Sequence, residues 1–339
     1  MPDPAAVRTP RSTVRRAPRL TARRAVLTQQ APLLLSLVML LATLLGYAGL
    51  YLARQGIFPT TFDWTNVVNH SLPLVFAAVG QGIVVLTRGL DLSVGGMVDL
   101  TNGLAATRLT GSPWSAAGWV VLILLVGAAG GLLNGLLVAW ARLQPILVTV
   151  ATLAIYQGLA LWVLPTPGGQ VPAGFTTVLT NPDAPTGLVW VAVVAAAWFV
   201  FRRTGVGSGI VALGNDPEAA RAGGLPVARL TVLAYVASGS FAAAAGLFLA
   251  ATTTAGDAVA GNVFVLTSIA AVVLGGISFF GGRGSLLGAI AGAFTLTLVV
   301  NVLFFADIDP LYQSFYQGLF LIAAVLLGNA AGRLARRTR

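Results

Sequence analysis

The sequence predicts an all-α polytopic membrane protein with about ten transmembrane helices. Hydrophobic residues make up 57% of the 339 residues and charged residues only 9%, and the mean hydropathy is +0.87. Such a chain has too little polar surface to enclose a water-soluble core. Apolar runs of about 20 residues recur along it, which is the length that crosses a hydrocarbon layer roughly 30 Å thick. Strand-like alternation is missing, which argues against a transmembrane barrel.

The order of the spans predicts which loops face the cytoplasm. The hydropathy places them at residues 31–53, 67–87, 96–111, 115–138, 145–165, 187–201, 230–252, 264–281, 285–305 and 311–330, of which the third and sixth are short. If the N-terminus is cytoplasmic, this order leaves only Arg54 and Arg108 on the outer side and every other arginine on the inner side. The excess agrees with the positive-inside rule, so we expect both termini in the cytoplasm of a bacterial inner membrane.

The two ends of the chain are predicted to be cytoplasmic tails around one permease-sized membrane domain. Residues 1–30 carry seven arginines, and we interpret them as a tail that lies against anionic lipid head groups. Nucleic-acid binding is the alternative, but a polybasic segment beside a first span ordinarily fixes orientation, so no nucleic-acid partner is expected. The membrane domain then covers residues 31–330, and residues 331–339 form the second tail.

The composition argues against catalysis by this chain. All 20 basic residues are arginine, cysteine is absent, and His70 is the single histidine. A Walker A loop needs its lysine against the phosphates, so the chain cannot hydrolyse ATP through one. The missing cysteines and the lone histidine leave little for a metal site. We therefore expect no catalytic residue, no metal and no cofactor bound by the chain itself.

A polar island interrupts the apolar sequence in the longest inner loop, residues 202–229. It holds Glu218, the only glutamate of the chain. Asp216 can cap a helix there, Pro217 suits the first helical position, and Gly223-Gly224 can end the helix. A short rigid helix of this kind can receive motion from a soluble partner, since a stiff element transmits displacement. The alternative is a helix that merely rests at the membrane surface.

Two carboxylates are predicted at or inside the membrane boundary, where an ionisable group is costly unless it is capped, paired or hydrated. Asp91 can accept N–H groups from the start of the next helix, with Ser93 doing likewise, and a role in gating is the alternative. Asp99 is the deepest carboxylate, expected to pair with Arg88 or to reach a water-filled cleft. Proton coupling is the alternative for Asp99.

Glycines and isolated polar residues inside the spans indicate close helix packing and a candidate solute path. Two glycine triplets at four-residue spacing, at positions 127, 131 and 135 and at 284, 288 and 292, each place three glycines on one helix face as a packing seam. The candidate path residues are Gln81, Asp99, Asn134, Tyr156, Gln157 and Asn301. Each polar group can instead join two helices, so a path requires that several of them share one cavity.

Four motifs occur in a fixed order: Gly-Leu-Asp-Leu-Ser-Val-Gly-Gly at 89–96, Gly-Leu-Leu-Asn-Gly-Leu-Leu-Val at 131–138, Gly-Asn-Asp-Pro-Glu-Ala-Ala-Arg at 214–221, and Ala-Val-Val-Leu-Gly-Gly at 271–276 followed by Phe-Gly-Gly-Arg-Gly-Ser at 280–285. Together they resemble the permeases of ribose/xylose/galactoside-type ABC importers, over about residues 60–330. The resemblance implies an ABC importer permease fold. It also implies that the gating or structural motif includes Asp91, Ser93, Gly95 and Gly96.

By the same resemblance, a cytoplasmic coupling segment would seat in a groove of a separate ATPase subunit. It comprises Gly214, Asn215, Asp216, Pro217, Glu218, Ala219, Ala220 and Arg221, with Arg283 on the same inner face. The implied partners are that ATPase, which would bind ATP and Mg²⁺, a second permease subunit, and a periplasmic or lipid-anchored sugar-binding protein. The expected cargo is a monosaccharide. The competing reading is a secondary transporter or facilitator that works alone and uses Asp99.

Overall fold

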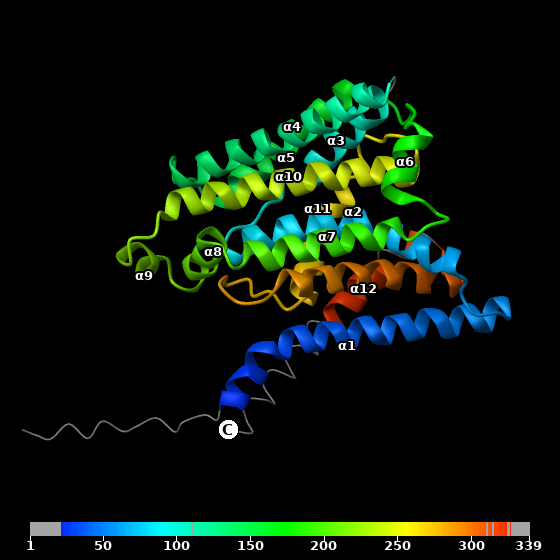
Figure 1. Cartoon of the computed structure of the whole chain (residues 1–339), viewed down its shortest axis with the longest axis horizontal. Coiled ribbons are helices and arrows are strands. Elements are labelled where there is room, and N and C mark those ends of the chain that lie inside the picture. Colours follow the sequence, from blue (N-terminus) through cyan, green and yellow to red (C-terminus); the bar gives the residue numbers. More distant parts are fainter. Residues whose placement is uncertain (1–21, 110–111, 310, 314, 324–325, 327–339) are drawn as a thin grey trace, which may run out of the picture.

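The computed structural model describes residues 22–109, 112–309, 311–313, 315–323 and 326, with side chains from residue 33 onward (Figure 1). It is built of helices. Their bounds are α1 (Ala22–Gln55), α2 (Thr61–Leu86), α3 (Val94–Arg108), α4 (Pro113–Ala139), α5 (Pro145–Val163), α6 (Ala173–Thr180), α7 (Thr186–Phe201), α8 (Gly205–Asn215), α9 (Pro217–Ala222), α10 (Val227–Thr253), α11 (Asn262–Leu274) and α12 (Leu286–Phe305).

The helices confirm an all-α polytopic membrane protein. In the part of the chain that is described, six helices are long and apolar enough to cross a bilayer: α1 from Leu33 onward, α2, α4, α5, α10 and α12. The bent pair of α7 and α8, which meet at 77°, would make a seventh span. The predicted total of ten and the cytoplasmic termini stay predictions. The span at 311–330 is described only in part, and residues 331–339 and most of the predicted N-terminal tail lie outside the described residues.

Three predicted spans differ from the helices by more than four residues. Helix α1 begins at Ala22, so it includes nine residues of the predicted tail, and α2 begins at Thr61, six residues before its predicted span. The span predicted at 264–281 ends at Leu274, because a glycine-rich turn follows it in which Gly276, Gly281, Gly282 and Gly284 all have positive φ. Glycine adopts that conformation without the Cβ clash that other residues meet, so these residues make a turn where a continuous helix was expected.

Helix α2 lies at the centre of the bundle. In its most apolar window 89% of the residues are buried, against 11% for α1. Helix α10 packs on α2, α3 and α4, while α1 packs on α12 along the edge of the molecule (Figure 1). Leucines and Val38 of α1 remain exposed, as expected for a helix whose outer face meets lipid.

Helix α4 confirms the predicted glycine seam. A Cβ added at Gly127 would collide with the carbonyl of Gly239 in α10, and one added at Gly131 would collide with the carbonyl of Tyr235. Gly135 likewise lies against Val232. Because none of the three carries a side chain, the backbones of α4 and α10 approach each other closely. In the second triplet Gly288 and Gly292 pack on α11 in the same way, but Gly284 lies in the turn before α12.

Replacing Gly131 with alanine is therefore expected to lower the free energy of unfolding of the purified protein by about 1–3 kcal/mol, because the added methyl group forces α4 away from α10. The melting temperature should fall accordingly. Gly118→Ala is the matched control, because Gly118 is in the same helix and a Cβ there would meet nothing within 4 Å. Thermal unfolding in detergent, followed by size-exclusion chromatography, compares the two variants. Equal melting temperatures would show that the seam does not fix the helix spacing.

The bundle has two ends that carry different loops. Helices α8 and α9 lie at one end and α6 at the other (Figure 1). The segment between α5 and α7 contains α6. Gly168 forms an antiparallel bridge with Gly256, with N–H···O distances of 2.9 and 2.8 Å. This bridge joins two loops at the α6 end, which is the end that the arginine distribution assigns to the outside.

Helix α11 begins in the interior of the bundle. Gly261, the residue before it, is buried and lies against the carbonyl of Gly95 and the carboxylate of Asp99 in α3. Helix α11 has 13 residues, which is about 20 Å of helix and shorter than the hydrocarbon layer. The chain therefore enters from the α6 end as a loop and becomes helical only partway through the bundle.

Candidate functional site

The polar island forms the predicted capped helix. Asp216 Oδ1 accepts the backbone N–H groups of Glu218 and Ala219, each at 3.0 Å. Pro217 is the first residue of α9, and Gly223 follows its last residue. Three of these features were predicted from residue type alone, since each residue suits one position of a helix end. The helix itself is six residues long, so it is a short element held rigid by its caps.

A second helix, α8, precedes α9 and was not predicted. Its sequence begins with Gly205-Val206-Gly207-Ser208-Gly209, which by propensity favours a loop. Thr204 nevertheless caps it by accepting the N–H of Gly207 at 3.1 Å. A Cβ at Gly207 would collide with the carbonyl of Phe201, and one at Gly209 would press on Leu230. These glycines lower the helix propensity of the sequence, but the close packing around α8 leaves no room for a side chain at either position.

The predicted coupling segment is largely exposed. Asn215, Asp216, Glu218, Ala219 and Arg221 are exposed, whereas Gly214 and Ala220 are buried. Helix α9 therefore anchors one small residue in the protein and presents an acidic and a basic side chain outward. An exposed rigid helix with both charges fits a polar groove on another protein better than it fits a bilayer.

Arg88 fastens the coupling segment to the turn between α2 and α3. Its Nε donates to the carbonyl of Gly214 at 2.7 Å and its Nη2 to the carbonyl of Asn215 at 2.6 Å. These are the last carbonyls of α8, which have no partner within the helix, and a cation is favourable at that end of the helix dipole. Arg88 has φ 68°, so the backbone is held in an uncommon conformation at this contact.

The turn between α11 and α12 contacts the same region, where the end of α2 lies against the end of α8. Gly282 N–H donates to the carbonyl of Leu86, the last residue of α2, at 3.0 Å. A Cβ on Gly214 would overlap both of these groups, and a Cβ on Gly282 would overlap Asn215. We call the five residues Leu86, Arg88, Gly214, Asn215 and Gly282 the inner junction. Exposed Arg283 follows it directly, and its place on the cytoplasmic face stays a prediction.

Asp91 is the centre of a buried polar network. Its Oδ1 accepts the N–H of Ser93 at 3.0 Å and the Ser93 hydroxyl at 2.6 Å, and its Oδ2 accepts the Ser238 hydroxyl at 2.7 Å. Asn134 donates to Ser93 Oγ at 2.9 Å. Tyr235 OH donates to the carbonyl of Leu90 at 3.2 Å. The network joins the α2–α3 turn to α4 and α10, and both oxygens of Asp91 are satisfied in it, whereas Asn134 Oδ1 has no partner among the described residues.

One part of the Asp91 expectation is wrong. Ser93 precedes α3 but makes no side-chain cap bond, because its hydroxyl donates to Asp91 instead. Sequence reasoning missed Ser238 and Tyr235, whose only signal was polarity inside an apolar span. Gly95 and Gly96 are explained by close approach, since a Cβ would strike the Gly261 carbonyl from the first and the Leu153 carbonyl from the second.

Asp99 does not pair with Arg88, because Arg88 is engaged at the inner junction. Asp99 is buried and its Oδ1 accepts the N–H of Gly261 at 2.5 Å, at the start of α11. Its Oδ2 has no hydrogen-bond partner among the described residues. Gln81 is also buried, and neither of its amide atoms has a partner in that part of the chain.

The other candidate path residues act as links between or within helices. Asn134 reaches Ser93, Tyr156 OH donates to the Gly130 carbonyl at 3.0 Å, Gln157 donates to Asn262 at 3.2 Å, and Asn301 donates to the Thr297 carbonyl at 2.9 Å. A pocket of about 980 Å³ opens beside α9, and none of the six candidates lines it. A translocation path through them stays a prediction.

The sequence profile of a family described as branched-chain amino acid transport system / permease component matches residues 64–325. The chain belongs to this permease family. The ribose import permease protein RbsC of Escherichia coli (strain K12) is 33% identical over 285 residues, which cover 80% of this chain and 87% of the relative. No solved structure matches the chain.

Two further relatives support the same assignment. A probable ABC transporter permease protein, y4mJ of Sinorhizobium fredii (strain NBRC 101917 / NGR234), is 35% identical over 280 residues, covering 79% of this chain and 83% of the relative. The autoinducer 2 import system permease protein LsrC of Yersinia pestis (strain Pestoides F) is 33% identical over 274 residues, covering 78% and 76%. The predicted resemblance and the predicted location of the permease in the bacterial inner membrane are thereby confirmed.

Proposed function

We propose that this permease is the membrane subunit of an ATP-driven importer that moves a monosaccharide into the cytoplasm. A separate ATPase subunit binds ATP and Mg²⁺, a periplasmic or lipid-anchored binding protein delivers the sugar, and a second permease subunit completes the pathway. The permease chain itself is non-catalytic. The proposal applies to this chain the import role that the names of its relatives state, since they are import permeases for ribose and autoinducer 2.

The observation that carries the proposal is the attachment of α9. The helix is exposed and capped, and the chain just before it is tied by Arg88 to the α2–α3 turn and by Gly214 to the α11–α12 turn. A force on α9 therefore reaches two helix pairs at once. A surface helix without an external partner needs no such attachment.

The mechanism follows from this geometry. When ATP draws two ATPase subunits together, each α9 moves with the groove that holds it, and the inner junction passes the displacement to α2, α3 and α12. The Asp91 network extends it to α4 and α10. Bare glycine backbones at the α4–α10 seam allow packed helices to slide, which is one recognised form of conformational change. Closing and opening of the pathway then follow the ATPase cycle.

Reconstitution tests the proposal. Vesicles that contain the permease, its ATPase and internal ATP are expected to accumulate radiolabelled monosaccharide from outside when the binding protein is added. Vesicles that contain the permease alone are expected to show no uptake above empty vesicles. A panel that includes ribose, xylose and galactose identifies the cargo, since specificity resides mainly in the binding protein.

A secondary transporter is the alternative, and Asp99 is the observation that favours it. This buried carboxylate has one oxygen without a partner in the described chain, as an intramembrane ion or proton site would. Uptake by the permease alone, driven by an imposed proton gradient and lost in Asp99→Asn, would replace the ATP-driven proposal with this one.

A further inference from the structure

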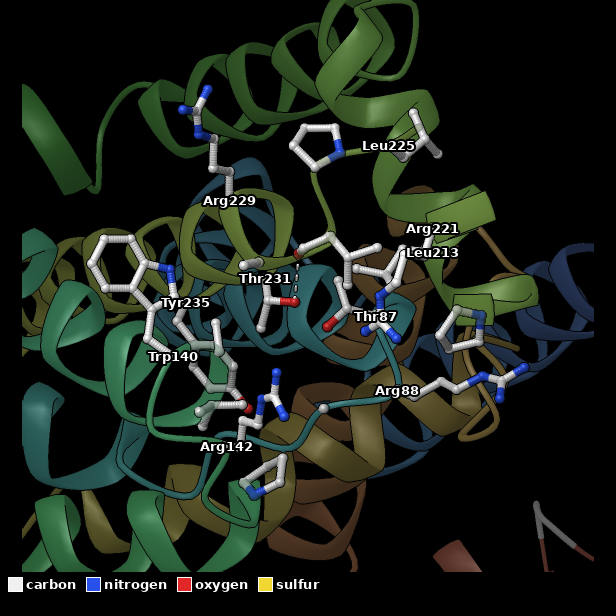
Figure 2. Close-up of a pocket in the computed structure, with 18 of the residues that line it drawn as sticks. Thr87, Arg88, Trp140, Arg142, Leu213, Arg221, Leu225, Arg229, Thr231 and Tyr235 are labelled. Carbon is white, nitrogen blue, oxygen red and sulfur yellow. Dashed lines mark hydrogen bonds between the residues drawn. The ribbon is translucent and has the colours of Figure 1, made fainter. Parts of the chain in front are cut away.

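A basic pocket opens at the α9 end of the bundle, between the coupling segment, the α4–α5 turn and the start of α10 (Figure 2). It has a volume of about 980 Å³. Four arginines line it, Arg88, Arg142, Arg221 and Arg229, and its lining holds no acidic residue. A pocket lined by arginines and by no acidic residue favours an anionic occupant.

The four arginines of the pocket differ in their contacts and in the direction of their guanidinium groups. Arg88 donates to the carbonyls of Gly214 and Asn215. Figure 2 shows the guanidinium groups of Arg142 and Arg221 directed into the pocket, whereas that of Arg229 points away from it. Arg142 lies in the α4–α5 turn and Arg221 in α9, so the fold brings two positive charges from distant parts of the sequence to one cavity.

Arg142 is also held in a special backbone conformation. Its φ is 55°, in the left-handed region that few residues other than glycine, asparagine and aspartate adopt readily. Arginine at such a position costs stability relative to glycine, and this cost is consistent with a role for the side chain.

The pocket borders an apolar surface that runs into the membrane. Trp140 is 70% exposed and Leu143 49% exposed at its rim, and Leu147 on the adjoining turn of α5 is 67% exposed. Exposed tryptophan beside arginine is typical of the bilayer interface. Acyl chains can lie along this face of α4 and α5 while a head group occupies the pocket above them.

We propose that this pocket binds the phosphate of an anionic phospholipid from the cytoplasmic leaflet, with Arg142 and Arg221 as its ligands. Guanidinium groups match phosphate oxygens in pairs, and basic pockets between transmembrane helices on the cytoplasmic side are known to take anionic head groups. Because Arg221 belongs to the coupling segment, the bound lipid contacts the element proposed to move with the ATPase. The lipid site itself does not depend on that proposed function.

Lipid binding is tested on the full chain in phosphatidylcholine nanodiscs, titrated with spin-labelled phosphatidylglycerol. The double variant Arg142→Gln/Arg221→Gln is expected to weaken phosphatidylglycerol binding about fivefold for each arginine removed. The matched control is Arg202→Gln/Arg203→Gln, which removes the same charge from exposed arginines outside the pocket and is expected to bind like wild type.

Three results would overturn the proposal. The first is equal loss in the control pair, which would show bulk attraction only. The second is unchanged binding in the double variant. The third is displacement of the lipid by millimolar inorganic phosphate, which would show that the pocket selects a free anion. If the double variant fails to fold, Arg142→Gly replaces it, since glycine suits the φ of 55°, and Arg142→Lys is expected to retain part of the affinity.

Discussion

Glu218→Arg is expected to abolish sugar import and to weaken binding of the ATPase subunit by about a hundredfold or more. Glu218 is exposed in the first turn of α9, whose caps fix its direction. In the proposed complex we expect it to face a basic group in the ATPase groove. Reversing its charge leaves that group facing another cation, which costs more than the loss of one hydrogen bond. Co-purification of the two subunits and uptake by vesicles measure the two effects.

Asp183→Arg is the matched control for this variant. Asp183 is also exposed, but it lies in the loop between α6 and α7 at the opposite end of the bundle. Its charge reversal should leave ATPase binding at the wild-type level, whatever its effect on the outer partner. If Glu218→Arg still binds the ATPase normally, α9 is not the docking element. If both variants lose the ATPase, the effect reflects folding and not contact.

Arg88→Gln is expected to separate ATP hydrolysis from transport. The two hydrogen bonds from Arg88 to Gly214 and Asn215 are charge-assisted, and bonds of this kind contribute about 1.5–3 kcal/mol each. Without them α9 can still bind the ATPase, but its movement is no longer passed to the α2–α3 turn. Import is expected to fall by about a hundredfold or more, as losing both bonds implies, while ATP hydrolysis continues. The ratio of sugar imported to ATP consumed measures the coupling.

Two further substitutions at Arg88 distinguish lost contact from backbone strain. Arg88→Lys can restore one of the two hydrogen bonds and should recover part of the coupling ratio. Arg88→Gly suits the φ of 68° but restores neither bond, so it should remain uncoupled. Recovery of coupling in the glycine variant would show that the conformation of the turn matters and that the guanidinium does not.

The sequence predicted features that depend on local rules. Asp216, Pro217 and Gly223 occupy the helix-end positions that these residue types favour. Most apolar runs became helices within three residues of the expected limits, whereas α1 and α2 begin nine and six residues early and α11 ends seven residues early. The α4 glycine seam was predictable because three glycines at four-residue spacing must share a face. Each of these inferences needs only the periodicity of one helix.

Features that depend on partners distant in the sequence were not predicted. Helix α8 forms although glycine is unfavourable in helices, since Gly207 and Gly209 fill sites with no room for a side chain. Arg88 was expected beside Asp99 because they are near in the sequence, yet it reaches residues 126 and 127 positions away. The Asp91 network recruits Ser238 across 147 positions. No single-sequence pattern indicates such pairings.

The start of α11 inside the bundle bears on how the protein is made. A helix of 13 residues is too short to be released from the insertion machinery into lipid as an independent span. Its first N–H groups would also be unpaired in hydrocarbon until Asp99 accepts one of them. We therefore expect α11 to remain at the translocon until α12 emerges. The two helices would then enter the membrane together as a hairpin that packs against α3. Insertion of α11 would require Asp99, which accepts an N–H group at its start.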